Sequence, residues 1–372
     1  MHRAAYITLS LVVAAIPVTP LIAQAPPVNS APTFTVGTAT ARRGERATGT
    51  ITVPAGVDSG YVMQVAVIHG ARPGPVLALV SGQHGTEYST IIGMQRLVPK
   101  IDPKTLAGTV IIIPVVNVPS FTSMTPARNP TDRKSMLGVW PGDSSGTQSY
   151  RAVAILMREV VNQANVIVDF HGGDLDEDIG IPFSAAVRGG RAGPDSESVR
   201  LAIAFGLKHI QIIDRDAASP RVGSRIDGQA LLQGKPVILV GVGRSGVVTD
   251  GDIANVDNGC LNLLGALKMI DRRRTPSYAP VWLDAAAPRI AAQGPGAFFA
   301  AVPHGAMVKK GQPLGYTTDL LGARTGDVPS PIDGLVVYVH GVPSMQRGTT
   351  LAEVLPVLPG VPAWKAPARN RP

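Results

Sequence analysis

The stretch PVLALVSGQHGTE, residues 75–87, decides the fold of this chain. Its apolar first half predicts a buried strand, and its polar second half ends in His84 and Glu87. The stretch VIVDFH, residues 166–171, repeats the arrangement, since a buried strand is followed at once by His171. Two strands that each end in a histidine predict a sheet with a polar site at its carboxyl edge.

Strand and helix patterns alternate through most of the chain. Apolar runs predict strands over 61–68, 76–80, 110–116, 166–170 and 236–242. Apolar residues at helical spacing predict helices over 90–97, 149–163, 198–205 and 259–269, whereas 247–252 is typical of a turn. This alternation predicts an α/β fold with a layered sheet over 34–274.

The amino-terminal residues are typical of an export signal. Arg3 supplies a positive charge, residues 4–22 are mostly apolar, and Ala23-Gln24-Ala25 offers a small-x-small cleavage site. We therefore expect 1–25 to be a signal peptide and the protein to be exported, periplasmic or extracellular. Pro17 and Pro20 interrupt the apolar run, so we expect no stable membrane insertion. Residues 26–33 form a linker rich in Pro, Ser and Asn.

The pattern changes near Thr275. From there to residue 358, short apolar runs are separated by Gly and Pro turns, which predicts a small β-barrel-like carboxyl-terminal domain. Residues 359–372 are Pro-rich and basic and are predicted to be a disordered tail.

Composition limits the classes of partner. With 372 residues, of which 45% are hydrophobic, the chain can bury a large core. The net charge of +8 is spread along the sequence and forms no basic face with interleaved aromatic residues, so we expect no nucleic-acid partner. Cys260 is the single cysteine and cannot form an internal disulfide. The oligomeric state is left open.

His84, Glu87 and His171 form a candidate metal site. Residues three apart are neighbours on a helical turn, so His84 and Glu87 can converge on one ion. Two imidazoles and one carboxylate, with a fourth position for water, are typical of a catalytic zinc site, and we expect one Zn²⁺ per chain. Alternatively, His84 is an ordinary loop histidine and Glu87 a helix-capping acid. Asp169 shares a strand face with His171 and is expected either to orient it or to pair with an arginine.

Four short motifs occur in order and resemble one known family. They are GQHGTE at 82–87, PVVN at 114–117, WPG at 140–142 and VDFH at 168–171. The sequence over roughly 60–270 is similar to the succinylglutamate desuccinylase/aspartoacylase family of zinc carboxypeptidase-like hydrolases, and the β-rich segment is similar to that family's carboxyl-terminal module. The resemblance implies a three-layer zinc carboxypeptidase-like domain with a mixed sheet.

The same resemblance implies an activity and residue roles. A small acylated molecule, an N-acyl amino acid or a related amide, would be hydrolysed by zinc-activated water. His84, Glu87 and His171 would hold the zinc, and no other cofactor is implied. Arg128 would stabilise the oxyanion that develops. The alternative for Arg128 is a solvated loop arginine.

Two positions depart from the family pattern. Leu137-Gly138 stands where members usually carry an Asn-Arg pair that grips a substrate carboxylate. Gly241 stands where the general-base glutamate is expected, a loss that typically removes roughly 10²–10⁴-fold in rate. The leading hypothesis is a zinc-dependent amidohydrolase with a different substrate grip. The alternative is a zinc-retaining, catalytically impaired binding protein.

Other residues of this chain could replace what is missing, although each is also explained as an ordinary solvated side chain. Candidate substitutes for the base follow His171 or the late strand: Asp174, Asp176, Glu177, Asp178, Asp250 and Asp252. Candidate substitutes for the clamp are Arg133, Arg151 and Arg244.

Overall fold

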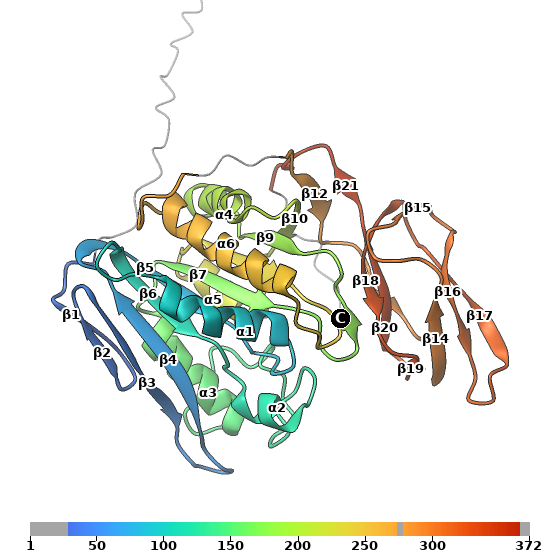
Figure 1. Cartoon of the computed structure of the whole chain (residues 1–372). Coiled ribbons are helices and arrows are strands. Elements are labelled where there is room, and N and C mark those ends of the chain that lie inside the picture. Colours follow the sequence, from blue (N-terminus) through green and yellow to red (C-terminus); the bar gives the residue numbers. More distant parts are fainter. Residues whose placement is uncertain (1–28, 274–277, 365–372) are drawn as a thin grey trace, which may run out of the picture.

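A ten-stranded mixed sheet forms the centre of the molecule in the computed structural model, which describes residues 29–273 and 278–364 (Figure 1). Its strand order is β21-β12-β10-β9-β11-β7-β5-β6-β4-β3. The bounds are β3 Glu45–Val53, β4 Tyr61–His69, β5 Arg72–Val80, β6 Ala107–Ile113, β7 Val166–His171, β9 Phe183–Arg188, β10 His209–Asp214, β11 Val237–Gly241, β12 Val281–Asp284 and β21 Val357–Leu358. This large mixed sheet confirms the α/β class expected from the sequence.

Three neighbouring strands of the sheet position the candidate site. β5, β7 and β11 run parallel, so their carboxyl ends meet at one edge. In this register Val80 lies beside Asp169, and Gly241 lies beside His171. Residues far apart in sequence therefore converge, as the sequence predicted for the two histidines.

Helices cover both faces of the sheet. On one face α1 (Tyr88–Leu97), α4 (Ala192–Phe205) and α6 (Asp250–Ala266) pack on one apolar core (Figure 1). On the other face α3 (Gln148–Leu156), α5 (Ile226–Leu232) and the hairpin of β1 (Thr33–Val36) and β2 (Ala39–Arg42) enclose a second core. Successive strand residues point to opposite faces, which is why central strands are apolar almost throughout.

Several elements differ from the sequence prediction. β9, β10 and α5 were not expected from the sequence, although β9 pairs directly with β11. The predicted helix over 149–163 is divided into α3 and a π-helical turn, Met157–Val161. The turn predicted for 247–252 is wrong at its end, because α6 begins at Asp250. Thr249 caps this helix by accepting a hydrogen bond from the Asp252 amide at 3.1 Å.

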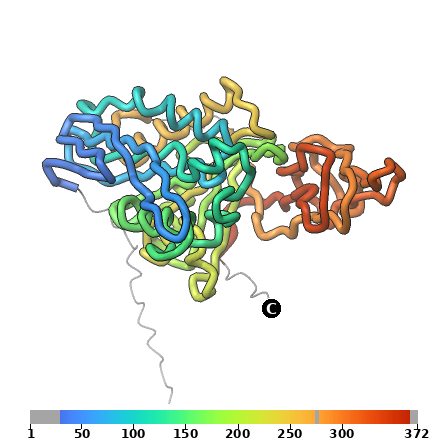
Figure 2. Tube along the Cα trace, turned by 90° about the horizontal axis from the view of Figure 1, so that it is seen from below, coloured from blue at the N-terminus to red at the C-terminus, as the bar shows by residue number. Residues whose placement is uncertain are grey.

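The β-rich segment leaves the large sheet and returns to it. β12 pairs in parallel with β10, and β21 pairs antiparallel with β12. Between them lie two small sheets, ordered β13-β20-β18-β15 and β17-β16-β14-β19, which form a lobe beside the main body (Figure 2). The bounds are β13 Ile290–Ala291, β14 Gly296–Ala300, β15 Met307–Val308, β16 Pro313–Thr318, β17 Arg324–Pro329, β18 Gly334–His340, β19 Ser344–Met345 and β20 Thr350–Leu355. The structure confirms a β-rich segment, and its barrel-like closure stays a prediction.

A short strand joins the lobe to the site edge. β8 (Glu177–Asp178) pairs antiparallel with β18, with Val339 beside Asp178 and His340 beside Glu177. The loop that follows His171 is therefore held by the carboxyl-terminal lobe.

The two ends of the chain are only partly described. The predicted signal peptide, 1–25, lies outside the described residues, as do 26–28 of the linker and 365–372 of the predicted disordered tail. Asn29 already bonds to the main body through Gly74, and Arg188 donates to the carbonyl oxygen of Pro362 at 2.8 Å. Within the described ranges, no helix is long and apolar enough to cross a membrane.

Candidate metal centre

The turn between β5 and α1 presents His84 and Glu87 to the sheet edge. Gly82 has φ of +69°, a conformation that glycine adopts without strain. A Cβ at Gly85 would lie 2.2 Å from the amide nitrogen of Phe121, so only glycine permits this approach to α2 (Val118–Ser123). Gly85 also donates its amide hydrogen to Ser120 Oγ at 3.0 Å. The two glycines therefore allow the tight turn that presents His84 and Glu87.

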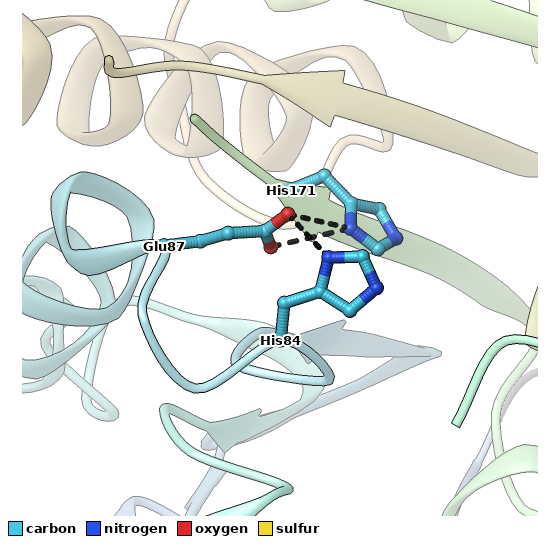
Figure 3. Close-up of side chains that lie close together, drawn as sticks. All are labelled: His84, Glu87 and His171. Carbon is cyan, nitrogen blue, oxygen red and sulfur yellow. Dashed lines mark hydrogen bonds and ion pairs between the residues drawn. The ribbon is translucent and has the colours of Figure 1, made fainter. Parts of the chain in front are cut away.

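The structure brings His84, Glu87 and His171 together (Figure 3). His84 Nδ1 lies 3.0 Å from Glu87 Oε1, and His171 Nδ1 lies 3.2 Å from each Glu87 oxygen. One donor atom from each residue lies within 4.8 Å of the other two. Glu87 and His171 are buried, and the His84 side chain is 13% exposed. The cluster therefore faces solvent through one imidazole.

These distances fit a tetrahedral zinc ion. Ligands about 2.05 Å from an ion at a tetrahedral angle lie about 3.3 Å from one another. The nitrogen-to-oxygen separations of 3.0 and 3.2 Å are close to that value. His84 Nε2 is also buried without a hydrogen-bond partner among the described residues. Nitrogen and carboxylate donors at this spacing suit zinc, so the residues present fit the expected metal.

Charge complementarity holds the cluster together. Burial alone would raise the pKa of Glu87, but the positive charges of His171 and His84 outweigh it and lower the pKa to about 2. Burial would lower the pKa of His84, yet Glu87 and Asp174 raise it to about 9. For His171, Asp169 and Glu87 likewise overcome burial and raise the pKa well above its usual value. A cation placed here would take over the role of the imidazole protons.

A buried hydrogen-bond network stands behind His171. Its Nε2 lies 3.2 Å from Asp169 Oδ2, so the orienting contact expected for Asp169 is present. Gln83 donates to Asp169 Oδ1 at 2.6 Å and accepts at 3.1 Å from the indole Nε1 of Trp140. With Nε2 directed at Asp169, the Nδ1 lone pair of His171 is free to face the cluster. The sequence gave Gln83 no role, because a buried glutamine beside a ligand carries no pattern of its own.

A group of three acidic residues adjoins the cluster of His84, Glu87 and His171. Glu87, Asp174 and Glu177 each offer an oxygen within 4.8 Å of the others. Asp174 accepts a hydrogen bond from Thr86 Oγ1, and its other oxygen lies 3.3 Å from His84 Nδ1. Burial, followed by the charges of Asp174 and Glu87, raises the pKa of Glu177 to about 7. Two of the four acids suggested after His171 therefore lie at the centre.

Gly241 lies on the same sheet edge, but an aromatic ring fills its side-chain position. Gly241 pairs with His171 on one side and with Phe183 on the other. A Cβ at Gly241 would lie 2.2 Å from Phe183 Cε1 and 2.5 Å from Cζ. Paired residues point their side chains to one face, so a side chain at 241 would emerge on the His171 face. Phe183 occupies the space where the expected glutamate would begin.

The candidate anion-binding arginines lie in different settings. Arg128 is exposed, and its Nη1 donates to the carbonyl oxygen of Arg133 at 3.1 Å. Arg151 is buried and donates to Asp58 Oδ1 at 2.6 Å and to the Gly146 carbonyl oxygen at 2.6 Å. Arg151 is therefore committed to structure and cannot replace the missing clamp.

Arg244 lies beside the end of β11 and is exposed. It lines a cavity of about 180 Å³ together with Gly243, Ile179 and Thr249. A larger cavity, about 560 Å³, is lined by residues of α4, β10 and α6. Neither cavity is lined by His84, Glu87 or His171, but the smaller one is lined by Gly243 and Arg244, which follow the end of β11.

Comparison with known protein families yields one match over more than half of the chain. The family model of the succinylglutamate desuccinylase/aspartoacylase catalytic domain matches residues 73–267. The chain is also 26% identical over 311 residues to N-alpha-acetyl-L-2,4-diaminobutyric acid deacetylase from Halomonas elongata, covering 80% of this chain and 87% of the relative.

Solved structures share the fold. An ectoine utilization protein from Ruegeria pomeroyi, with product bound, superposes with a TM-score of 0.75 at 21% identity, covering 88% of this chain and 99% of the other. A succinylglutamate desuccinylase/aspartoacylase from Rhodobacter sphaeroides superposes with a TM-score of 0.74 at 22% identity, covering 85% and 96%. The similarity extends well beyond the matched domain in both cases.

Proposed function

Because the chain belongs to the succinylglutamate desuccinylase/aspartoacylase family, we propose that it is a zinc-dependent hydrolase that removes the acyl group from an N-acyl amino acid or a related amide. The observation that carries the proposal is the convergence of His84, Glu87 and His171, in which the Nδ1 atoms of both histidines lie 3.0–3.2 Å from Glu87 Oε1. The deacetylase from Halomonas elongata supports this substrate class, since its name describes removal of an acetyl group from an amino acid.

His84 Nδ1, His171 Nδ1 and the Glu87 carboxylate would hold one zinc ion. Bound there, zinc would act as a Lewis acid and make water a stronger acid near neutral pH. Asp169 would fix the His171 ring through Nε2, and Gln83 would fix Asp169. Family membership supports Arg128 as the residue that stabilises charge on the carbonyl oxygen, and its exposed position leaves it accessible to a substrate.

The substrate grip would differ from the usual Asn-Arg clamp. Leu137 is half-buried and Gly138 is exposed, and neither side chain can form a charged bidentate bond. Arg244 is the better candidate for an anionic substrate group, because it lines the small cavity beside the site edge. A substrate carboxylate held by Arg244 would then approach from the β11 side.

We also propose export from the cytoplasm, which rests on the sequence of residues 1–25. Cell fractionation of the full-length protein, with removal of the first 25 residues as the control, tests it. Recovery of the full-length protein in the cytoplasm would contradict export.

The test of the activity is a hydrolysis panel with zinc-loaded protein. N-acetyl, N-succinyl and longer N-acyl amino acids would be offered, with amine release as the readout and zinc content measured in parallel. We expect one zinc per chain and turnover of at least one panel member. Stoichiometric zinc without turnover would overturn the proposal in favour of the impaired binding protein.

A further inference from the structure

No side chain of β11 can take the place of the missing general base. The Phe183 ring lies where a side chain at Gly241 would begin, and β11 ends at Gly241. A base for the reaction must therefore come from another element. The loop after His171 is the nearest source, because it carries two members of the acidic group that includes Glu87.

We propose that Glu177, placed by the carboxyl-terminal lobe, is the catalytic proton acceptor in place of the side chain that Gly241 lacks. This inference rests on the proposed hydrolase function and adds a residue to it. A carboxylate oxygen of Glu177 lies within 4.8 Å of a Glu87 oxygen, so it faces the metal centre without belonging to the His84, Glu87 and His171 set.

Glu177 is distinguished from the neighbouring acids by how little its carboxylate is bonded. Asp169 accepts from Gln83 and contacts His171 Nε2, and Asp174 accepts from Thr86 and contacts His84 Nδ1. The hydrogen bond described for the Glu177 carboxylate is a single long one, 3.4 Å from the Asp174 amide. Glu177 is also half-buried, which leaves it able to meet water and substrate.

The remaining acidic candidates, Asp176, Asp178, Asp250 and Asp252, lie outside the group formed by Glu87, Asp174 and Glu177. Asp252 accepts from Ser89 Oγ at 3.1 Å, and the Asp250 side chain is fully exposed beside Arg96. Asp178 faces His304 of the lobe at 3.9 Å. Among the acids that the sequence offered as substitutes and that lie at the centre, Glu177 alone keeps an uncommitted carboxylate in the described part of the chain.

The backbone of Glu177 is held from two sides. Its carbonyl oxygen accepts from the Ser245 amide at 2.7 Å, which ties it to the segment after β11. On the other side it pairs with His340 of β18, and the neighbouring Asp176 carbonyl oxygen accepts from the Gly341 amide at 2.7 Å. This double attachment gives the rigid positioning that a general base needs.

The proposed step balances without a further reactant. Glu177 takes one proton from water while the water oxygen bonds to the acyl carbon and the carbonyl oxygen receives the electron pair. When that pair returns, the carbon–nitrogen bond breaks, and the nitrogen leaves with the bonding electrons and the proton from Glu177. The products are a carboxylic acid and an amine, and Glu177 is again a carboxylate.

The test compares Glu177→Gln with Asp176→Asn, a matched amide substitution one residue away. Zinc-loaded proteins are assayed on the best panel substrate for kcat and KM, and zinc affinity is measured by chelator competition. For Glu177→Gln we expect kcat to fall roughly 10²–10⁴-fold, with KM and zinc affinity within about threefold of wild type. Asp176→Asn should match wild type in kcat, KM and zinc affinity.

The outcomes separate this inference from the proposed function. Glu177→Gln with full kcat overturns the role of Glu177 alone, and so does loss of zinc, which would make Glu177 a ligand. A zinc-loaded wild type without turnover overturns both proposals. Folding is checked by the melting temperature, which should not fall, because the substitution removes a charge beside Asp174 and Glu87. Glu177→Asp is the second variant and should retain part of kcat because it keeps a carboxylate.

Discussion

The strands β7 and β11 lie side by side and end at the same level, but their ends are built differently. β7 ends in His171, whose two ring nitrogens face the carboxylates of Glu87 and Asp169. β11 ends in Gly241, over which the Phe183 ring lies. The end of β7 is held by charged groups and by paired donors and acceptors. The end of β11 is instead packed against an aromatic ring. Two neighbouring strand ends that are partners in the sheet therefore differ in the kind of contact that each one makes.

The largest expected effect comes from removing His84, one of the three proposed zinc ligands. His84→Ala should reduce bound zinc from one per chain to near zero and lower kcat by about 10³-fold or more, since two ligands cannot hold a structured catalytic zinc. Metal analysis and the hydrolysis assay provide the two readouts. His209→Ala, which removes a half-buried histidine outside the cluster, is the control. Retention of stoichiometric zinc in His84→Ala would show that His84, Glu87 and His171 do not form the metal site.

The next effect concerns the network behind the ligands. In Asp169→Asn, the amide oxygen can accept from Gln83 or from His171, but it cannot serve both as the carboxylate does. We expect zinc affinity to fall roughly 10–100-fold, as measured by chelator competition. Asp250→Asn, an exposed change on α6, should leave affinity unchanged. Equal affinity in both variants would mean that the His171 ring needs no orienting partner.

A smaller effect is expected at Gly241, at the end of β11. Gly241→Ala places a Cβ within 2.2 Å of the Phe183 ring, so the free energy of unfolding should fall by about 1–3 kcal/mol in denaturant titrations. Gly193→Ala, whose Cβ would meet nothing within 4 Å on α4, is the matched control.

A double-mutant cycle sharpens that result. In the Phe183→Ala background the cost of Gly241→Ala should disappear, because the ring that it meets is gone. An unchanged cost would show that the backbone, and not the ring, excludes a side chain at this position. The same geometry means that Gly241→Glu can restore a carboxylate to β11 only together with a smaller residue at 183.

An effect on stability of similar size is expected at Trp140, which lies at the far end of the hydrogen-bond network behind His171. Trp140→Phe removes the indole donor and leaves Gln83 Oε1 buried without that bond. The free energy of unfolding should fall by about 1–3 kcal/mol, with zinc affinity changed only a few-fold. Trp282→Phe on β12 is the control. A loss of affinity as large as that of Asp169→Asn would show that the network acts as one unit.

The sequence predicted that His84 and His171 lie where two buried strands end, because that information is local. The apolar runs define both the strands and the places where they stop, at Val80 and at His171. The α/β class followed from the alternation of strand and helix patterns, and the mixed sheet was expected from the family resemblance. β9 and β10 were missed because their short sequences, FSAAVR and HIQIID, mix polar with apolar residues and contain no long apolar run.

The sequence could not show which side chains fill the space around the site. It identified Gly241 as a missing base, but it could not show that Phe183 fills the space. It offered several acids as substitutes, and the distances were needed to place Asp174 and Glu177 beside Glu87. Arg151 was equally plausible as a clamp until its hydrogen bonds to Asp58 and Gly146 showed that it is a structural residue.

The return of the chain to the large sheet through β21 has a consequence for engineering. Since β12 and β21 extend the sheet beyond β10, the lobe is inserted between two strands and does not simply follow the main body. A protein shortened at residue 274 would expose the hydrogen-bonding groups along β10, a ready template for pairing with another chain. The lobe is therefore better replaced by a short connection between residues 284 and 357 than cut away, so that the outer strands continue to shield the sheet.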